Sequence, residues 1–236
     1  MSKIKNIFKI LSPFQWASVI IVCGFTLYFA LTDTESRWYY TLLSSLAAVC
    51  GIMNVVLCAK GKKAQYYWGL VNIASYIAIS AMSRLYGEVM LNTFYYIPLQ
   101  FIGLYMWRKN YSNTSDTVKV RKMKLIPAII LIISTFIGIC LYKYVLSVIG
   151  GNSVWLDSTS TVISIVANAL MVLRYREQYL LWLVVNVVTT VMWALKGDPI
   201  MTTMWAVYAF NAVYGYYLWN KMSKESDSVS TVSEAV

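Results

Sequence analysis

The sequence predicts an all-α integral membrane protein, in which two parallel three-helix-bundle repeats are joined by one linker helix (3+1+3) and preceded by an extra N-terminal hydrophobic helix. Composition is the first observation behind this prediction. Hydrophobic residues make up 59% of the chain and charged residues 13%, against roughly 45–50% and 25% in a typical soluble domain. Eight apolar segments are each long enough to cross a bilayer, which takes about 18 or more residues. The third observation is an internal repeat.

The apolar segments set the order of the predicted helices. They run from 14 to 31, 38 to 58, 65 to 84, 88 to 107, 125 to 142, 155 to 173, 178 to 195 and 199 to 219. Lysines precede the first segment, as they would in a secretory signal, but it is long, lacks a small-x-small cleavage site and is followed by further spans. We therefore expect it to be retained.

Basic residues alternate between the two sides of the predicted membrane. With the N-terminus inside, the inner segments hold all but four of the 20 lysine and arginine residues, and the outer ones hold Arg37, Arg84, Lys143 and Lys196. Cytoplasmic loops are enriched in these residues, so we expect both termini in the cytoplasm. Anchoring to anionic membrane lipids explains the net charge of +10, and a nucleic-acid partner is not expected.

The chemistry of metal and cofactor sites is sparse. Cys23, Cys50, Cys58 and Cys140 all lie in apolar segments without C-x-x-C spacing, and the chain has no histidine. We therefore expect no metal, no cofactor and no disulfide.

The repeat is carried by two similar motifs. The stretch "WGLVNIAS" at 68–75 returns 114 positions later as "WLVVNVVT" at 182–189, and Asn54 falls over Asn168 at the same offset. One helix further on the offset is 112, and the matched pairs are Tyr96 with Tyr208, Gly103 with Gly215, Tyr105 with Tyr217 and Trp107 with Trp219. Because a single crossing joins the copies, they enter the membrane in the same direction.

This organisation predicts five parts. They are an N-terminal tail and helix (1–35), a first repeat (36–109), a basic inner loop with the linker helix (110–150), a second repeat (151–220) and a disordered cytoplasmic tail (221–236). For Trp107, Trp219, Gly103 and Gly215 we favour interface anchoring and close helix packing over a role in binding.

The second-repeat motif places four side chains along one helix face. Trp182, Asn186, Thr189 and Trp193 stand at i, i+4, i+7 and i+11. An asparagine is costly in hydrocarbon unless its amide is satisfied, so this stripe is expected to face the bundle interior and bind a ligand. The alternative is an interhelical hydrogen bond between the two repeats, worth about 1 kcal/mol.

Other candidates repeat this pattern incompletely. The first copy has Trp68, Asn72 and Ser75 but Ile79 where the second has Trp193. On the third helices, Asn92, Tyr96 and Gln100 correspond to Met204, Tyr208 and Ala212, and the second copy adds Asn211. A symmetric scaffold with an asymmetric polar lining is expected of a cavity for an asymmetric ligand.

The duplicated W-x-x-x-N motif, the stretch "NTFYYIPLQFIGLYMW" and the 3+1+3 layout resemble the PnuC vitamin transporters, distant relatives of the SWEET sugar transporters, over about residues 36–220. The resemblance implies a protein of the bacterial inner membrane, with nicotinamide riboside as its substrate, bound midway through the membrane between the two bundles. It also implies facilitated diffusion with alternating access and trapping by a cytoplasmic riboside kinase. Carried over by position, the best ligand candidates are Trp182, Asn186 and Trp193, then Gln100, Tyr96 and Asn72.

The residues also suit a cation without a buried carboxylate. Aromatic faces attract a pyridinium ring, and Asn and Gln side chains can pair with a carboxamide and with hydroxyls. Thiamine, riboflavin and a sugar remain alternative substrates. An intramembrane enzyme would lack general acid–base groups, and a structural membrane protein would leave the polar lining unexplained. The oligomeric state stays open, a homo-oligomer included.

Overall fold

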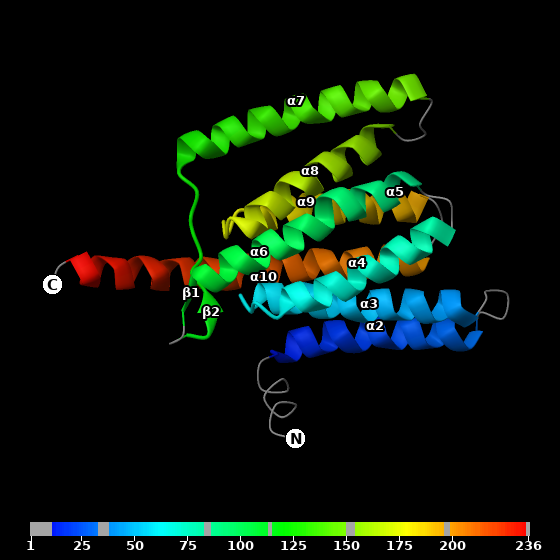
Figure 1. Ribbon diagram of the computed structural model, residues 1–236, viewed down its shortest axis with the longest axis horizontal. Helices are drawn as coiled ribbons and strands as arrows, with labels where there is room; N and C mark the ends of the chain where they lie inside the picture. The colour runs from blue at the N-terminus through cyan, green and yellow to red at the C-terminus, as the bar shows by residue number, and fades with distance from the viewer. Residues whose placement is uncertain are drawn as a thin grey trace. The chain divides into compact units, whose positions relative to one another are not determined.

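The computed structural model describes residues 11–32, 38–82, 86–112, 115–149, 154–195 and 199–234 (Figure 1). Its helices are α2 (Pro13–Thr32), α3 (Trp38–Ala59), α4 (Gln65–Met82), α5 (Tyr86–Leu91), the π-helix η1 (Asn92–Tyr96), α6 (Ile97–Lys109), α7 (Leu125–Ile149), α8 (Val154–Val172), α9 (Gln178–Leu195) and α10 (Pro199–Glu234). Each predicted apolar segment overlaps helical structure, and the segment 88–107 is divided among α5, η1 and α6. The prediction of an all-α membrane protein is confirmed.

Some of these helices are long and apolar enough to cross a membrane. By length and composition, four helices in the described ranges can each cross a bilayer, namely Pro13–Thr32, Trp38–Ala59, Leu125–Val148 and Trp155–Val172. The large apolar side chains of α7 are mostly exposed, as in Ile132 and Phe136, which suits contact with lipid. The protein is therefore membrane-embedded.

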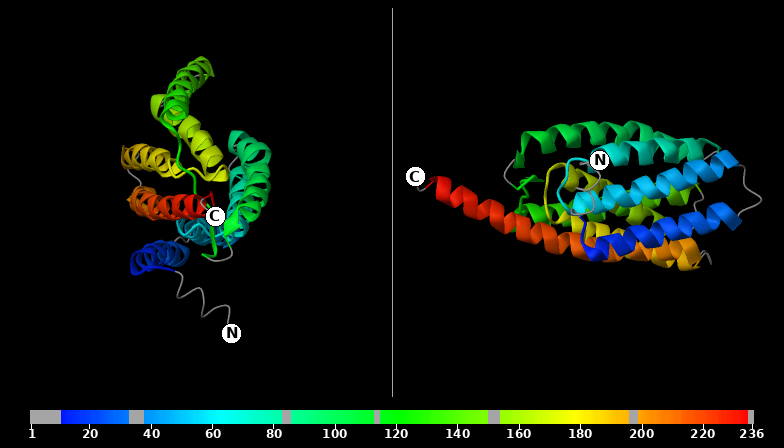
Figure 2. Two further views of the ribbon diagram at one scale, coloured as in Figure 1. Left: turned by 90° about the vertical axis from the view of Figure 1, so that its left-hand side faces the viewer. Right: turned by 90° about the horizontal axis from the view of Figure 1, so that it is seen from below.

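The chain divides into two compact units, residues Met1–Tyr105 and Met106–Val236. In the first unit α2 packs on α3, α3 on α4, and α4 on α5 and η1. In the second, α7 packs on α8, α8 on α9, and α9 on α10 (Figure 2). The middle helix of each repeat, α4 or α9, thus contacts the helix before it and the helix after it.

The same turn closes the first helix of each repeat. After α3, Gly61 has φ 64°, and the amides of Gly61 and Lys62 donate to the carbonyls of Cys58 (2.9 Å) and Leu57 (3.0 Å). This is a Schellman C-cap. After α8 the pattern recurs with Arg174 at φ 66°, a left-handed conformation that is unusual for a residue with a side chain.

The third helix of the first repeat is interrupted. The sequence predicts one continuous span over 88–107, but Asn92–Tyr96 forms a π-helix between α5 and α6. A π-helix winds more residues into a turn than an α-helix and occurs often at functional sites. In the second repeat the matching helix, α10, is α-helical throughout.

Two helices run further than the sequence predicts. α7 continues to Ile149 rather than ending at 142, and α10 continues to Glu234, where residues 221–236 are predicted to be disordered (Figure 1). Neither extension contains a glycine or a proline, the residues that most strongly oppose helix continuation. The polar composition of the tail therefore fails to predict its backbone.

The basic inner loop also has structure that the sequence did not predict. Strands β1 (Tyr111–Ser112) and β2 (Thr117–Val118) pair antiparallel. Beyond them, the Arg121 amide donates to the Arg174 carbonyl (2.8 Å), and the Arg176 amide donates to the Arg121 carbonyl (3.0 Å). The loop is thereby joined by backbone hydrogen bonds to the α8–α9 connection.

Candidate ligand-binding site

In the first unit, polar side chains from α3, α4 and α6 lie close together around Gly69. A Cβ on Gly69 of α4 would lie 2.7 Å from Asn54 Nδ2 and 2.8 Å from Gln100 Oε1. Asn54 Nδ2 donates to both the backbone oxygen and the side-chain Oε1 of Gln65, each at 2.8 Å. Gln100 is buried, and its Oε1 has no hydrogen-bond partner among the described residues. This carbonyl is an acceptor available to a ligand.

Two polar side chains of the first-repeat motif form hydrogen bonds within their own repeat. Asn72 Nδ2 donates to the Ala47 carbonyl of α3 at 2.7 Å, and the Ser75 hydroxyl donates to the Val71 carbonyl of its own helix at 2.9 Å. Trp68 is half-buried. The Asn72 amide therefore makes an interhelical hydrogen bond, and this bond lies within one repeat.

The π-helix changes the angle about the helix axis between the polar residues predicted to line the third helix. On an α-helix, Asn92 and Gln100 would be rotated apart by about 80°, because eight residues exceed two turns. A π-turn takes up an extra residue and so reduces this rotation. Asn92 is buried, and the Tyr96 ring lies edge-on to Tyr95 with centroids 5.1 Å apart. The irregular winding thus brings Asn92 and Gln100 closer to a common face.

In the second unit, α9 buries the polar members of its motif. Asn186 is 4% exposed and Thr189 is 5% exposed. Trp182 is half-buried and packs against an apolar cluster of Ile139, Ile163 and Val185. The side chain of Trp193 lies outside the described part of the structure.

Helix α10 adds buried polar groups without partners. Asn211 is 0% exposed, and within the described ranges neither of its amide atoms has a hydrogen-bond partner. The same holds for Nε1 of Trp205, whose ring is edge-on to Tyr208 at 5.7 Å. Each such group costs about 1–3 kcal/mol when buried. Asn211 and Tyr208 lie near the middle of the predicted span, so these groups are suited to a ligand held at mid-depth.

Trp205 was missed by the sequence reasoning because it has no tryptophan counterpart at the repeat offset. A signal was nevertheless present: Trp205 precedes Tyr208 by three residues and Asn211 by six, so all three fall on one broad side of a helix. It also packs against the same apolar cluster as Trp182.

The two copies of the motif occupy different faces of their helices. Counting from the left-handed residue of each turn, Asn72 is 11 residues after Gly61, whereas Asn186 is 12 residues after Arg174. One residue corresponds to about 100° of rotation. The residue 11 positions after Arg174 is Val185, which packs toward α8, as Asn72 bonds to α3. Asn186 is therefore rotated away from the position that Asn72 takes.

The glycines of the third helices have packing roles inside their own repeats. A Cβ on Gly103 would lie 2.5 Å from the ring of Tyr66, and a Cβ on Gly215 would overlap the ring of Tyr179. Both tyrosines are buried on the preceding helix. This agrees with the packing interpretation of the two glycines.

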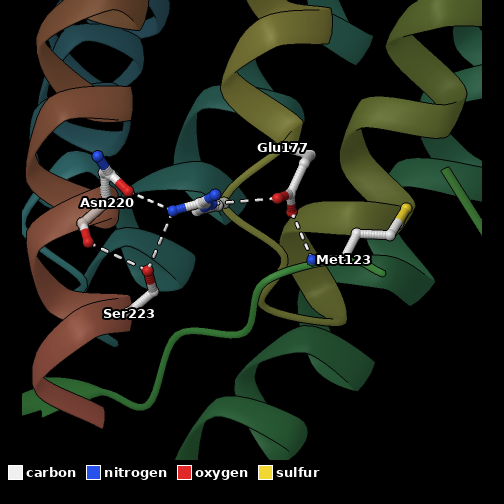
Figure 3. Close-up of polar contacts among 5 residues, drawn as sticks. Met123, Glu177, Asn220 and Ser223 are labelled. Carbon is white, nitrogen blue, oxygen red and sulfur yellow. Dashed lines mark hydrogen bonds and ion pairs between the residues drawn. The ribbon is translucent and has the colours of Figure 1, made fainter. Parts of the chain in front are cut away.

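The basic end of the second unit is held by a polar network. Arg176 Nε donates to Glu177 Oε1 at 3.1 Å, and the Met123 amide donates to Glu177 Oε2 at 3.1 Å (Figure 3). Arg176 also donates to Asn220 Oδ1 and to the Ser223 hydroxyl. The α8–α9 connection is thereby tied to the residues before α7 and to α10.

Arg174 lies beside this network. Its side chain is buried, and Nη1 donates to the Lys119 carbonyl at 3.2 Å. Burial, and after it the positive charge of Arg121, lower the pKa of the Arg174 guanidinium. The Arg121 guanidinium itself stacks over the Tyr175 ring, 4.8 Å from its centroid. These contacts fix the basic loop to the second repeat.

A family model described as nicotinamide mononucleotide transporter matches residues 41–221. The chain belongs to this family. The match spans both three-helix repeats and the linker between them, which is the region where the sequence resembles the PnuC transporters.

Relatives within the family are similar over most of their length. A nicotinamide riboside transporter PnuC of Neisseria mucosa is 39% identical over 77% of this chain and 73% of its own. A nicotinamide riboside transporter PnuC of Haemophilus influenzae is 33% identical over 91% of this chain and 93% of its own. A crystal structure of the vitamin B3 transporter PnuC superposes with a TM-score of 0.73 at 34% identity, covering 91% of this chain and 94% of that one. The family is one of membrane transporters, not enzymes.

Proposed function

We propose that this protein transports nicotinamide riboside across the bacterial inner membrane by facilitated diffusion with alternating access. The observation that carries the proposal is a set of buried polar groups at mid-helix that have no hydrogen-bond partner within the described part of the chain, above all the Asn211 amide. The relatives at 39% and 33% identity are named as transporters of this riboside. Its carboxamide and hydroxyls are the kind of partners that an unpaired amide lacks.

The aromatic groups supply the second part of the recognition. Nicotinamide riboside carries a fixed positive charge on its pyridinium ring, and aromatic faces attract such a cation by about 0.5–2 kcal/mol per contact when desolvated. In the second unit Trp182 and Trp205 border one apolar cluster, and Tyr208 contacts Trp205. We assign these residues, with Asn186 and Asn211, as the ligand contacts of the second repeat.

The first repeat contributes a different set. Gln100 presents an acceptor that no other described residue pairs with, and Asn92 and Tyr96 belong to the π-helix. Asn72 already donates to Ala47, and we therefore rank it below Gln100.

A mononucleotide substrate, which the family description names, fits this lining less well. Six stretches of the two repeats, 38–59, 65–82, 89–107, 158–173, 178–195 and 199–219, contain no Lys, Arg, His, Asp or Glu. A phosphate in a membrane interior needs neutralising partners, whereas the riboside brings no anion. We therefore propose the riboside and not its phosphate as the transported species.

The same absence of ionisable groups bears on energy coupling. Proton-coupled carriers place an acidic residue or a histidine within the membrane, and those six stretches have none. A cation carried alone is drawn inward by the membrane potential, with about 2.3 kcal/mol per 100 mV. With the basic end facing the cytoplasm, phosphorylation by a riboside kinase would then trap the product.

The test is uptake of labelled nicotinamide riboside into liposomes containing the purified protein. We expect accumulation to follow an imposed potassium-diffusion potential and to be competed by unlabelled riboside. The mononucleotide, thiamine, riboflavin and ribose are offered as competitors. Accumulation driven by a pH or sodium gradient at zero potential would contradict uniport, and stronger competition by another compound would reassign the substrate.

A further inference from the structure

An open groove lies at the basic end of the second unit, apart from the candidate ligand residues. Its volume is about 660 Å³, and its apolar lining comes from Leu125 and Ala128 of α7, Leu180 of α9 and the ring of Tyr216 on α10. Leu125 is 75% exposed and Leu180 is 45% exposed. The described residues thus leave an apolar surface uncovered where α7 begins.

The rim of this groove is positively charged. Lys122 and Lys124 line it and are exposed, and among the described residues neither forms an ion pair. Glu177 also lines the groove, but its two carboxylate oxygens are taken by Arg176 Nε and by the Met123 amide (Figure 3). The charge left to meet a ligand is that of the two lysines.

The groove lies at the start of a helix that can cross a membrane, where headgroups are expected to meet hydrocarbon. Leu125 is the first residue of a helix long and apolar enough to cross a membrane, and the two lysines lie immediately before it. Lysines at this depth attract anionic lipid, while the apolar lining beyond them can cover an acyl chain. A free phosphate would use the lysines but would leave Leu125 and Leu180 uncovered.

We propose that this groove is a binding site for one anionic phospholipid, whose phosphate contacts Lys122 and Lys124 and whose acyl chain lies along Leu125, Ala128 and Leu180. The bound lipid fills the space between the start of α7 and helices α9 and α10. It thereby supports a linker helix whose packing in the unit is mainly against α8. This site is independent of the transported substrate.

The charge requirement is tested by native mass spectrometry of the purified full chain with phosphatidylglycerol or phosphatidylcholine. We expect tight binding of one phosphatidylglycerol, weakened about tenfold or more in Lys122→Gln/Lys124→Gln. The control Lys60→Gln/Lys63→Gln removes two positive charges from the α3–α4 connection and should retain that site. Equal affinity for the two lipids, or equal losses in both double variants, would overturn the proposal.

The apolar requirement is tested separately. Ala128→Phe fills the groove without changing any charge and should weaken phosphatidylglycerol binding, whereas Ile129→Phe, on the neighbouring face of α7, should not. Phosphatidylglycerol should also raise the melting temperature of the wild type more than that of Ala128→Phe. If Ala128→Phe binds as the wild type does, or if millimolar inorganic phosphate displaces the lipid, the site is a phosphate site and the proposal fails.

Discussion

Replacing Asn211 with leucine tests the assignment of the buried amide to the ligand. Asn211 is fully buried, and both ends of its amide lack partners among the described residues. A buried polar group without partners costs about 1–3 kcal/mol, and leucine has a similar size to asparagine without the polar atoms. We therefore expect the ligand-free Asn211→Leu protein to be more stable than the wild type by about 1–3 kcal/mol.

The same substitution should weaken binding. If the riboside supplies the missing partners, their loss costs about 1.5–3 kcal/mol of affinity, or roughly 10- to 100-fold in Kd. Calorimetry gives the affinity, and chemical unfolding in detergent gives the stability without ligand. An effect of opposite sign on these two quantities is characteristic of a group held ready for a ligand.

Asn168 of α8 provides the control. It is also buried, but its Nδ2 donates to the Ser164 carbonyl at 3.0 Å. Asn168→Leu should lose about 1 kcal/mol of stability and leave the Kd unchanged. The reasoning is refuted if Asn211→Leu behaves in the same way, with lower stability and unaltered riboside affinity.

Three further outcomes are expected. Gly103→Ala should lower stability by about 1–3 kcal/mol, because its Cβ would lie 2.5 Å from the buried ring of Tyr66. The control Gly24→Ala adds a Cβ that meets nothing within 4 Å and should leave stability unchanged. Unfolding curves of the two variants measure the difference. Arg174→Gly should be about 1–2 kcal/mol more stable than Arg174→Ala, since only glycine adopts φ 66° without strain; equal stabilities would mean that this turn is not strained. Glu177→Leu should release the Met123 amide and speed its hydrogen exchange, and unchanged exchange would contradict the network.

The apolar segments predicted the helices well because hydrocarbon leaves a spanning chain almost no other choice than to satisfy its backbone within a helix. Helix ends at turns were also readable where glycine or a change in polarity marks them, as at Gly61. The π-helix was not, because nothing in "NTFYY" differs locally from an α-helical sequence. The hairpin in the inner loop was missed because its pairing involves two residues in each strand.

The candidate residues were harder to rank from sequence. The motif match at offset 114 made both Asn72 and Asn186 ligand candidates, with Asn186 ranked first, yet the turns that precede these residues correspond at offset 113. Periodicity gives the face of a helix but not what that face meets, so it could not show that Asn72 bonds to Ala47. Nor could it identify Trp205, whose unpaired Nε1 is a property of its surroundings.

The one-residue displacement between the two motifs has a consequence for how such a molecule can be assembled. In a homodimer of a single repeat, an exact twofold operator would force every side chain to appear twice in the same environment. An asparagine that packs between helices would then do so in both halves. Joining the copies in one chain removes that constraint. The asparagine of one repeat can then bond two helices of that repeat together, while the asparagine of the other repeat can face a different environment and contact a ligand.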